Sequence, residues 1–223
     1  MDGDRQPHAP LAPAQLLEPL RFVLGHPALA RVTLLSFLFS VVQNSTTAYL
    51  AVYFTEVLHY SPVAAGLMLS ATQVGGLAGR IAWGHLADNA AIGPRRVLTG
   101  VSSGILVLLV ALALLPAGTA VWVALLLVLL VGACAVGWSG VVVGEVVRLA
   151  PPGTAGMATG GAMALTFIAV ISGPPAFGGL SSLLGSYRFG FLLLAVPMAA
   201  CWWLLVRLRR DETPEQMAAT GRN

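Results

Sequence analysis

Long apolar segments alternate along the chain with short breaks that are rich in polar residues, glycine or proline. A bilayer core about 30 Å thick takes about 20 apolar residues per helical crossing, and each segment is long enough for one crossing. The pattern therefore predicts an all-α membrane protein with six transmembrane helices in one domain, residues 29–209. The expected crossings are residues 29–57, 62–83, 96–115, 120–147, 156–184 and 187–208.

The two ends of the chain are more polar than this domain. Residues 1–28 combine a Pro-rich tail with an amphipathic segment, 14–28, whose apolar residues recur at helical spacing and suit a membrane surface. We expect a cytoplasmic tail and linker here, and no cleaved signal peptide, because no positively charged region leads directly into an apolar segment. Residues 210–223 are expected to form a second cytoplasmic tail.

Glycine and proline mark expected helix starts, breaks and contacts. Ser61 before Pro62 is typical of a helix start, with a capping hydroxyl followed by proline in the first turn. In the fifth segment, Gly173, Pro174 and Pro175 remove or weaken backbone hydrogen bonds at mid-membrane depth, so we expect a kink or an interruption and a hinge. Glycine pairs four residues apart predict close helix packing, and they are Gly75 with Gly79, Gly140 with Gly144, and Gly156 with Gly160.

Composition agrees with a membrane domain and disfavours several other classes. Charged residues make up 9% and hydrophobic residues 57% of the chain, whereas a soluble domain carries about 25% charged residues. The net charge is +3, but the basic residues are scattered at segment ends, which disfavours a nucleic-acid partner. Cys134 and Cys201 lie in different apolar segments with no second ligand at metal-binding spacing, so we expect free thiols and no metal or cofactor.

Every basic residue is an arginine, and the arginines are unevenly divided between the two ends of the segments. An even number of crossings places both termini on one side. That side receives 11 of the 12 arginines, and only Arg188 falls on the other. By the positive-inside rule, we expect both termini in the cytoplasm. We also expect the domain to lie in the cell (plasma) membrane.

The loop between the second and third segments resembles the signature of the major facilitator superfamily. Residues 79–98 read GRIAWGHLADNAAIGPRRVL. The family pattern has a glycine, a leucine, an aspartate and a basic residue before a second glycine and two basic residues. The match departs at Asn89, where a basic residue is usual, and in two extra residues before Gly93. Residues 144–151 and 173–188 are similar to the ends of the family's tenth and eleventh helices.

The resemblance implies the C-terminal half of a transporter, built from two inverted three-helix repeats. Residues 83–86 and 177–180 then fall in equivalent loops on opposite faces, although two Gly-rich turns can also look alike by chance. The partners implied are a small-molecule substrate, the lipid bilayer, and either an N-terminal half or a second copy of the chain. Local similarity is to monocarboxylate and oxalate–formate transporters.

Two sets of residues are candidates for function. The cytoplasmic gate or signature loop comprises Gly84, Asp88, Gly93, Arg95, Arg96, Glu145 and Arg148. Charges of both signs at helix ends can favour one gate state, and the alternative is that they are solvated interfacial charges. The candidate substrate cavity comprises Gln43, Asn44, Thr46, Thr47 and Arg80. The neutral residues could instead bond helices together.

Arg80 has three interpretations. It resembles the substrate-contacting arginine in the eighth helix of monocarboxylate and oxalate–formate transporters, and a guanidinium fork suits a carboxylate. It could equally reach the membrane surface or pair with Glu145, and no acid lies one turn before it.

These patterns predict alternating-access transport of a small solute, a small organic anion or a neutral metabolite. The alternative is a truncated or accessory membrane subunit with no transport of its own. An intramembrane enzyme is disfavoured, because the four histidines lie in the tail or near segment ends, without a nucleophile, base or ligand set around them.

Overall fold

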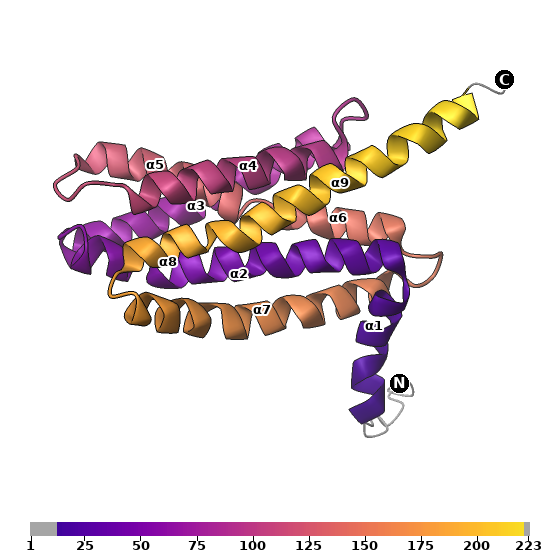
Figure 1. Ribbon diagram of the computed structural model, residues 1–223, viewed down its shortest axis with the longest axis horizontal. Coiled ribbons are helices and arrows are strands. Elements are labelled where there is room, and N and C mark those ends of the chain that lie inside the picture. The colour runs from indigo at the N-terminus through magenta and orange to yellow at the C-terminus, as the bar shows by residue number, and fades with distance from the viewer. Residues whose placement is uncertain (1–12, 221–223) are drawn as a thin grey trace, which may run out of the picture.

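The structure, a computed structural model, describes the backbone of residues 13–220 and the side chains of residues 17–207. Within this part of the chain every helix or strand element is an α-helix (Figure 1). The helices are α1 (Pro13–Gly25), α2 (Pro27–Glu56), α3 (Pro62–Asp88), α4 (Gly93–Ala113), α5 (Val121–Ala135), α6 (Ser139–Leu149), α7 (Ala155–Leu183), α8 (Tyr187–Leu193) and α9 (Ala195–Thr220).

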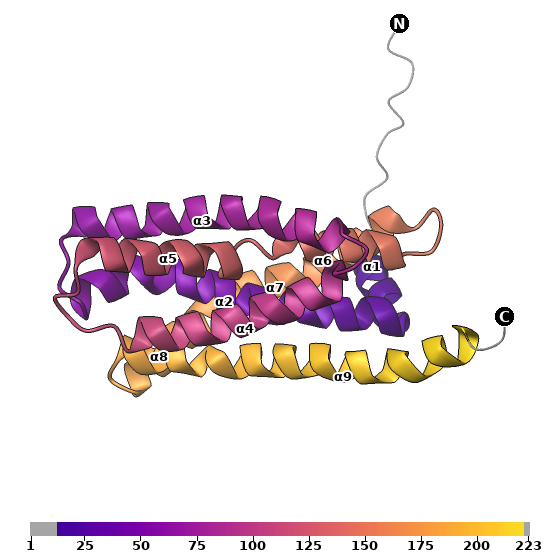
Figure 2. The ribbon, with the colours of Figure 1, turned by 90° about the horizontal axis from the view of Figure 1, so that it is seen from above.

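The crossing helices lie side by side in one elongated bundle, with connections alternating between its two ends (Figures 1 and 2). α1 lies across the bundle axis at the end where α2 begins (Figure 1). Pro19 and Val23 of α1 pack on Gly161 near the start of α7, where a methyl group would overlap the Pro19 carbonyl. The amphipathic segment is therefore a helix anchored to the bundle.

This architecture confirms the expected all-α membrane fold. Five spans are long and apolar enough to cross a bilayer. Three of them are the single helices α2, α4 and α7. The other two are α5 joined with α6, and α8 joined with the first part of α9. The remaining expected crossing, α3, has 27 residues and lies in the same bundle. α3 is less apolar than the other five spans because it contains Gln73, Arg80 and several glycines.

The expected fourth crossing, residues 120–147, is wrong as a single helix. α5 ends at Ala135 and α6 begins at Ser139. Between them, the Gly137 amide donates to the Gly132 carbonyl, 3.3 Å away, rather than to the Ala133 carbonyl four residues back. The Ala133 carbonyl instead accepts the indole Nε1–H of Trp83 on α3 at 2.7 Å. A side chain from the neighbouring helix thus satisfies the group that the break releases.

Other expected boundaries also need correction. Ser61 caps α3 as expected, accepting the Ala64 amide at 3.2 Å, but α3 continues to Asp88, beyond the expected end at residue 83. The third crossing begins at Gly93 rather than at residue 96. The sixth is divided at Leu194 into α8 and α9, and α9 runs to Thr220, so the segment after residue 208 continues the helix.

The interruption expected at Gly173, Pro174 and Pro175 is not present. α7 is one helix from Ala155 to Leu183 with both prolines inside it. Gly173 is buried, and a methyl group there would press on the α2 backbone at Val41. Neighbouring helices allow proline inside transmembrane helices, so packing on α2 explains the continuity of α7.

Helix packing relates the first three crossings to the last three. α3 packs along α5, α2 along α7, and α4 along α9. In an inverted repeat, α2 corresponds to α5 with α6, α3 corresponds to α7, and α4 corresponds to α8 with α9. Replacing each helix by its counterpart turns the contact of α3 with α5 into the contact of α7 with α2. The same replacement turns the contact of α4 with α9 into itself. The pattern is that of two three-helix repeats of opposite orientation.

Glycines set the closest of these contacts. Gly75 and Gly79 on α3 face the carbonyl groups of Leu129 and Ala133 on α5 so closely that a methyl group would overlap them. This confirms close packing for the first expected glycine pair. The other two pairs do not pack helix backbones in this way, because Gly144 and Gly156 face open space.

Two loops at opposite ends of the bundle share a local structure. Gly93 and Gly185 have φ angles of +73° and +69°, which favour glycine, and each stands just before an arginine-bearing helix start. Arg95 donates from Nε to the Leu205 carbonyl at 3.2 Å, and Arg188 donates to the Ala113 carbonyl at 2.8 Å. Arg188, the one arginine among the described side chains at its end of the bundle, therefore bonds the C-terminus of α4, where a positive charge is favourable.

Candidate functional site

The polar band of α2 is divided between the core and the helix surface. Ser45 and Thr46 are buried, and neither hydroxyl has a hydrogen-bond partner. Ser45 lies against Gly173 of α7. Asn44 donates to the Ser40 carbonyl of its own helix at 2.9 Å. Gln43, Asn44 and Thr47 are half-buried, so these three, and not Thr46, retain access to a space beside α2.

Arg80 is exposed on the side of the bundle formed by α3 and α6. Its Cγ would lie 3.4 Å from a methyl group placed on Gly140, so the side chain crosses the glycine face of α6. Glu145, the pairing partner considered for it, instead binds Arg148. The same face of α3 exposes Gln73 about two turns earlier. Arg80 thus adds a guanidinium to a polar strip along α3.

The signature loop is held by a glycine turn and by hydrogen bonds from arginine side chains to backbone carbonyls. Gly93 takes a positive φ, and Arg96 donates to the Ala91 carbonyl at 2.7 Å. Arg95 is half-buried against α9 through Leu205. Asp88 is exposed at the end of α3, and Gly84 has open space beside it. The loop therefore presents an acid and a base, Asp88 and Arg96, to the surroundings of the bundle.

Glu145 and Arg148 form an ion pair one turn apart on α6. Arg148 donates from Nε and from a terminal nitrogen to the two carboxylate oxygens at 3.0 and 2.7 Å, which is a bidentate geometry. The Glu145 side chain is 15% exposed and that of Arg148 is 66% exposed. Figure 1 shows that the end of α6 and the loop between α3 and α4 lie at the same end of the bundle, so the gate candidates share one end.

The opposite end of the bundle is closed by aromatic residues and loop hydrogen bonds. The Tyr60 hydroxyl donates to the Thr119 carbonyl, joining the loop after α2 to the loop after α4. Burial raises the pKa of Tyr60, and because the ordinary pKa of tyrosine already lies well above neutral, the hydroxyl remains a donor. Tyr49, on α2, packs against Phe177 of α7 and Tyr187 of α8.

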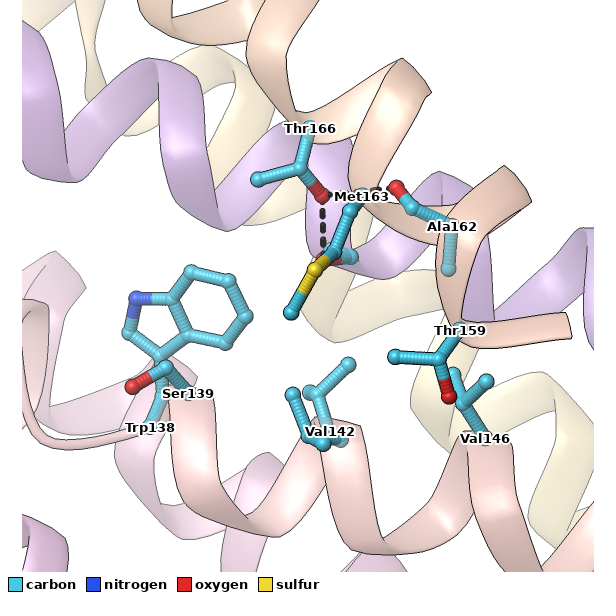
Figure 3. Close-up of a pocket in the computed structure, with 10 residues that line it drawn as sticks. Trp138, Ser139, Val142, Val146, Thr159, Ala162, Met163 and Thr166 are labelled. Carbon is cyan, nitrogen blue, oxygen red and sulfur yellow. Dashed lines mark hydrogen bonds between the residues drawn. The ribbon is translucent and has the colours of Figure 1, made fainter. Parts of the chain in front are cut away.

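A cavity of about 150 Å³ lies between α2, α6 and α7 (Figure 3). Its walls are mainly apolar, with hydroxyl groups on all three helices. The lining residues are Ser36, Trp138, Ser139, Val142, Val143, Val146, Thr159, Ala162, Met163 and Thr166. None of the five candidate cavity residues, Gln43, Asn44, Thr46, Thr47 and Arg80, is among them, so their binding role stays a prediction.

The cavity residues were missed because their signal is weak in the sequence. Ser36 and Ser40 precede the polar band at spacings of four residues, which places them on the face of α2 that also carries Asn44. Thr159, Met163 and Thr166 share one face of α7. This periodicity could have indicated a polar stripe on each helix, but not which helices would meet.

Crossing helices arranged as two inverted repeats, with charged groups gathered at one end, are an arrangement that many secondary transporters share. The family model described as Major Facilitator Superfamily matches residues 2–160, and the chain therefore belongs to the major facilitator superfamily. This confirms the family suggested by the signature loop. It also sets the intramembrane-enzyme alternative aside, because the family is one of transporters.

Two solved transporters have the same fold. The structure of the fucose:proton symporter of E. coli matches with a TM-score of 0.70 and 18% identity over 89% of this chain and 46% of that one. A peptide transporter solved in complex with alafosfalin matches with a TM-score of 0.71 and 21% identity over 90% of this chain and 42% of that one. The chain thus spans less than half the length of either transporter. Among curated proteins, none matches the chain.

Proposed function

We propose that this chain supplies the C-terminal half of an alternating-access transporter that moves a small solute across the plasma membrane. The observation that carries the proposal is the polar strip on α3, where Gln73 and Arg80 are exposed on a helix packed inside a membrane bundle. Polar and charged groups at membrane depth are costly unless they face a partner or a water-filled path. A transport path beside α3 meets that requirement.

The proposed topology places both termini in the cytoplasm. The end of the bundle that bears Arg95, Arg96 and Arg148 also bears the start of α2 (Figure 1). An excess of arginine is typical of cytoplasmic loops. In this orientation the signature loop and the Glu145–Arg148 pair lie on the cytoplasmic side, where they act as the gate, and Gly173, Pro174 and Pro175 supply flexibility in α7.

A small organic anion is the substrate class that Arg80 favours. The guanidinium offers parallel donors that match a carboxylate, and Glu145, the nearest candidate counter-charge on α6, is engaged by Arg148. The half-buried amides and hydroxyl of Gln43, Asn44 and Thr47 would bind neutral groups of the same solute. A neutral metabolite is the second choice.

One half of a transporter forms one wall of the transport path. The two solved relatives are more than twice as long as the aligned part of this chain, since the match covers 46% and 42% of them. We therefore propose that an N-terminal half or a second copy of the chain supplies the other wall. The alternative is an accessory membrane subunit with no transport of its own.

Uptake into proteoliposomes tests the proposal. The purified chain is reconstituted, and entry of radiolabelled lactate is compared with entry into protein-free liposomes, with and without an inward proton gradient. We expect saturable uptake that Arg80→Ala abolishes and Arg80→Lys partly retains, because lysine keeps the charge but not the fork. Arg31→Ala, which removes another exposed arginine, is the matched control.

The outcomes separate the alternatives. Undiminished uptake by Arg80→Ala would remove Arg80 from the substrate site. Absence of uptake of lactate and of neutral solutes, with the helices intact by circular dichroism, would rule out transport by copies of this chain alone, and would leave a half that needs a separate N-terminal half or an accessory subunit. The mass of the particle in nanodiscs then shows whether two copies associate.

A further inference from the structure

The break between α5 and α6 lies against the part of α3 that carries Arg80. α3 packs along α5 and also contacts α6, so it passes the point where one helix ends and the other begins (Figure 2). We propose that this break positions the Arg80 guanidinium for an anionic solute, and that Gly137, Gly140 and Trp83 are the positioning residues. The inference rests on the proposed function, because it describes how the arginine of the proposed substrate site is held.

The backbone of α3 at Arg80 lies directly on the break. A methyl group on Gly137 would lie 2.8 Å from the Gly79 carbonyl carbon and 2.9 Å from the Arg80 nitrogen. A methyl group on Gly79 would in turn overlap the Ala133 carbonyl. Helix backbones that approach this closely need glycine at the contact. The reciprocal contacts leave little room for α3 to slide or rotate, so the Cα of Arg80 is fixed relative to α6.

Trp83 fixes the same turn of α3 by a hydrogen bond. Its indole Nε1–H donates to the Ala133 carbonyl at 2.7 Å. That carbonyl is free to accept because the Gly137 amide donates to the carbonyl five residues back instead of four. Gly79 and Trp83, one turn apart, therefore both meet Ala133, and Arg80 lies in the turn between them. A continuous helix in place of the break would use this acceptor internally.

The aliphatic part of the Arg80 side chain lies on Gly140, in the first turn of α6. Arg80 Cγ would lie 3.4 Å from a methyl group at this glycine, and outside α6 no other described atom lies within 4 Å of that position. A larger side chain there would occupy the space of the arginine stem. Packing restricts the rotamers of a long stem, so less side-chain entropy is lost when a ligand binds.

The guanidinium stays available although the stem is held. Arg80 is exposed, and its guanidinium makes no hydrogen bond or ion pair with another described residue. Glu145, the acid considered as its partner, is bound to Arg148. All the N–H donors of the fork can therefore bind a carboxylate. A fixed stem with free donors is the arrangement that a preorganised anion site requires.

The mobility of the Arg80 guanidinium tests the positioning without any ligand. The full chain is prepared in detergent micelles with isotopically labelled arginine, and the Arg80 Nε–H signal is identified by its loss in Arg80→Lys. The heteronuclear NOE of this signal reports motion on the picosecond to nanosecond timescale. We expect a higher NOE for Arg80 than for Arg31, which is also exposed. Gly140→Leu should lower the Arg80 NOE to the Arg31 value, and Trp83→Phe should lower it in part.

Lactate uptake links the position of the guanidinium to binding. Gly140→Leu should raise the KM for lactate by up to about a hundredfold, because a displacement of about 1 Å can have an effect of that size. Trp83→Phe keeps an aromatic ring and removes one hydrogen bond, so it should raise the KM by roughly two- to tenfold. Gly100→Leu is the control. Gly100 is an exposed glycine of α4 with open space beside it, and this change should alter neither the KM nor the Arg80 NOE.

The two measurements separate failure of this proposal from failure of the proposed function. An Arg80 signal as mobile as that of Arg31, or an ordered Arg80 signal in a folded Gly140→Leu, would overturn the positioning. An unchanged KM in Gly140→Leu and in Trp83→Phe, while Arg80→Ala abolishes uptake, would also overturn it. If Gly140→Leu does not fold, Trp83→Phe supplies both comparisons. Absence of lactate uptake by the wild-type chain would count against the proposed function, and the NOE comparison would still decide whether the break holds Arg80.

Discussion

Gly132 of α5 lies directly against the backbone of Thr72 on α3, where even a methyl group would overlap the Thr72 carbonyl. Gly75 and Gly79 make the reciprocal approach from α3 toward Leu129 and Ala133. Apolar surfaces gain little from meeting each other inside lipid, so close van der Waals packing of this kind is what holds membrane helices together.

Gly132→Ala should destabilise the bundle. The added methyl group meets backbone atoms that cannot rotate away, and overpacking of this kind costs about 1–3 kcal/mol. The measurement is thermal unfolding in detergent, followed by reaction of Cys134 and Cys201 with a thiol-reactive dye, because both thiols are at least partly buried. Gly66→Ala is the control, since Gly66 has open space beside it on α3. Equal melting temperatures for the two variants would refute the packing role.

Arg188→Ala should also lower stability. The guanidinium donates to the Ala113 carbonyl at the C-terminus of α4, and loss of a charged hydrogen bond costs about 1.5–3 kcal/mol, with less expected for a half-exposed group. The same thermal assay measures the change. Arg31→Ala removes an exposed arginine at the other end of the bundle, and a loss of the same size there would mean that net charge, and not the helix terminus, is responsible.

Glu145→Gln should separate gating from stability. Arg148 is 66% exposed, and exposed ion pairs contribute about 0–1 kcal/mol, so the melting temperature should hardly change. If the pair acts in the gate, the rate of lactate uptake should change clearly although the melting temperature does not. High salt, which screens the pair, should change uptake by the wild-type protein in the same direction as Glu145→Gln. A variant that melts much earlier than wild type with normal uptake would assign the pair to stability alone.

Cysteine labelling should distinguish the two ends of the bundle. Ala90, in the signature loop, and Ala117, in the loop after α4, are both exposed. With Cys134 and Cys201 replaced by alanine, Ala117→Cys should react with a membrane-impermeant maleimide on intact cells, and Ala90→Cys only after the cells are opened. The reverse pattern would invert the proposed topology.

The crossings could be predicted because bilayer thickness and local capping act within single segments. Ser61 and Pro62 illustrate this, since their roles in starting α3 require no knowledge of other helices. The break between α5 and α6 depends instead on Trp83, 50 residues away, which bonds the released Ala133 carbonyl. The local sequence shows only an apolar run that contains Gly137. It therefore does not indicate whether the helix is interrupted there or continuous.

The candidate site follows the same division. The charges of the signature loop are recognisable because their order along the chain is a local pattern. The cavity brings Ser36 of α2 together with Thr166 of α7, 130 residues apart, and no local pattern reports which polar faces will meet. The uninterrupted α7 has the same cause, because its contact with α2 at Val41 overrides the preference of Pro174 and Pro175 for a break.

The packing of the first three crossings against helices later in the chain has a consequence for how this protein is made. The most extensive partner of α2 is α7, that of α3 is α5, and that of α4 is α9. Each of the first three crossings therefore waits in the lipid for a helix that the ribosome has yet to synthesise. Insertion can proceed crossing by crossing, but the bundle closes only when the last segment has entered the bilayer.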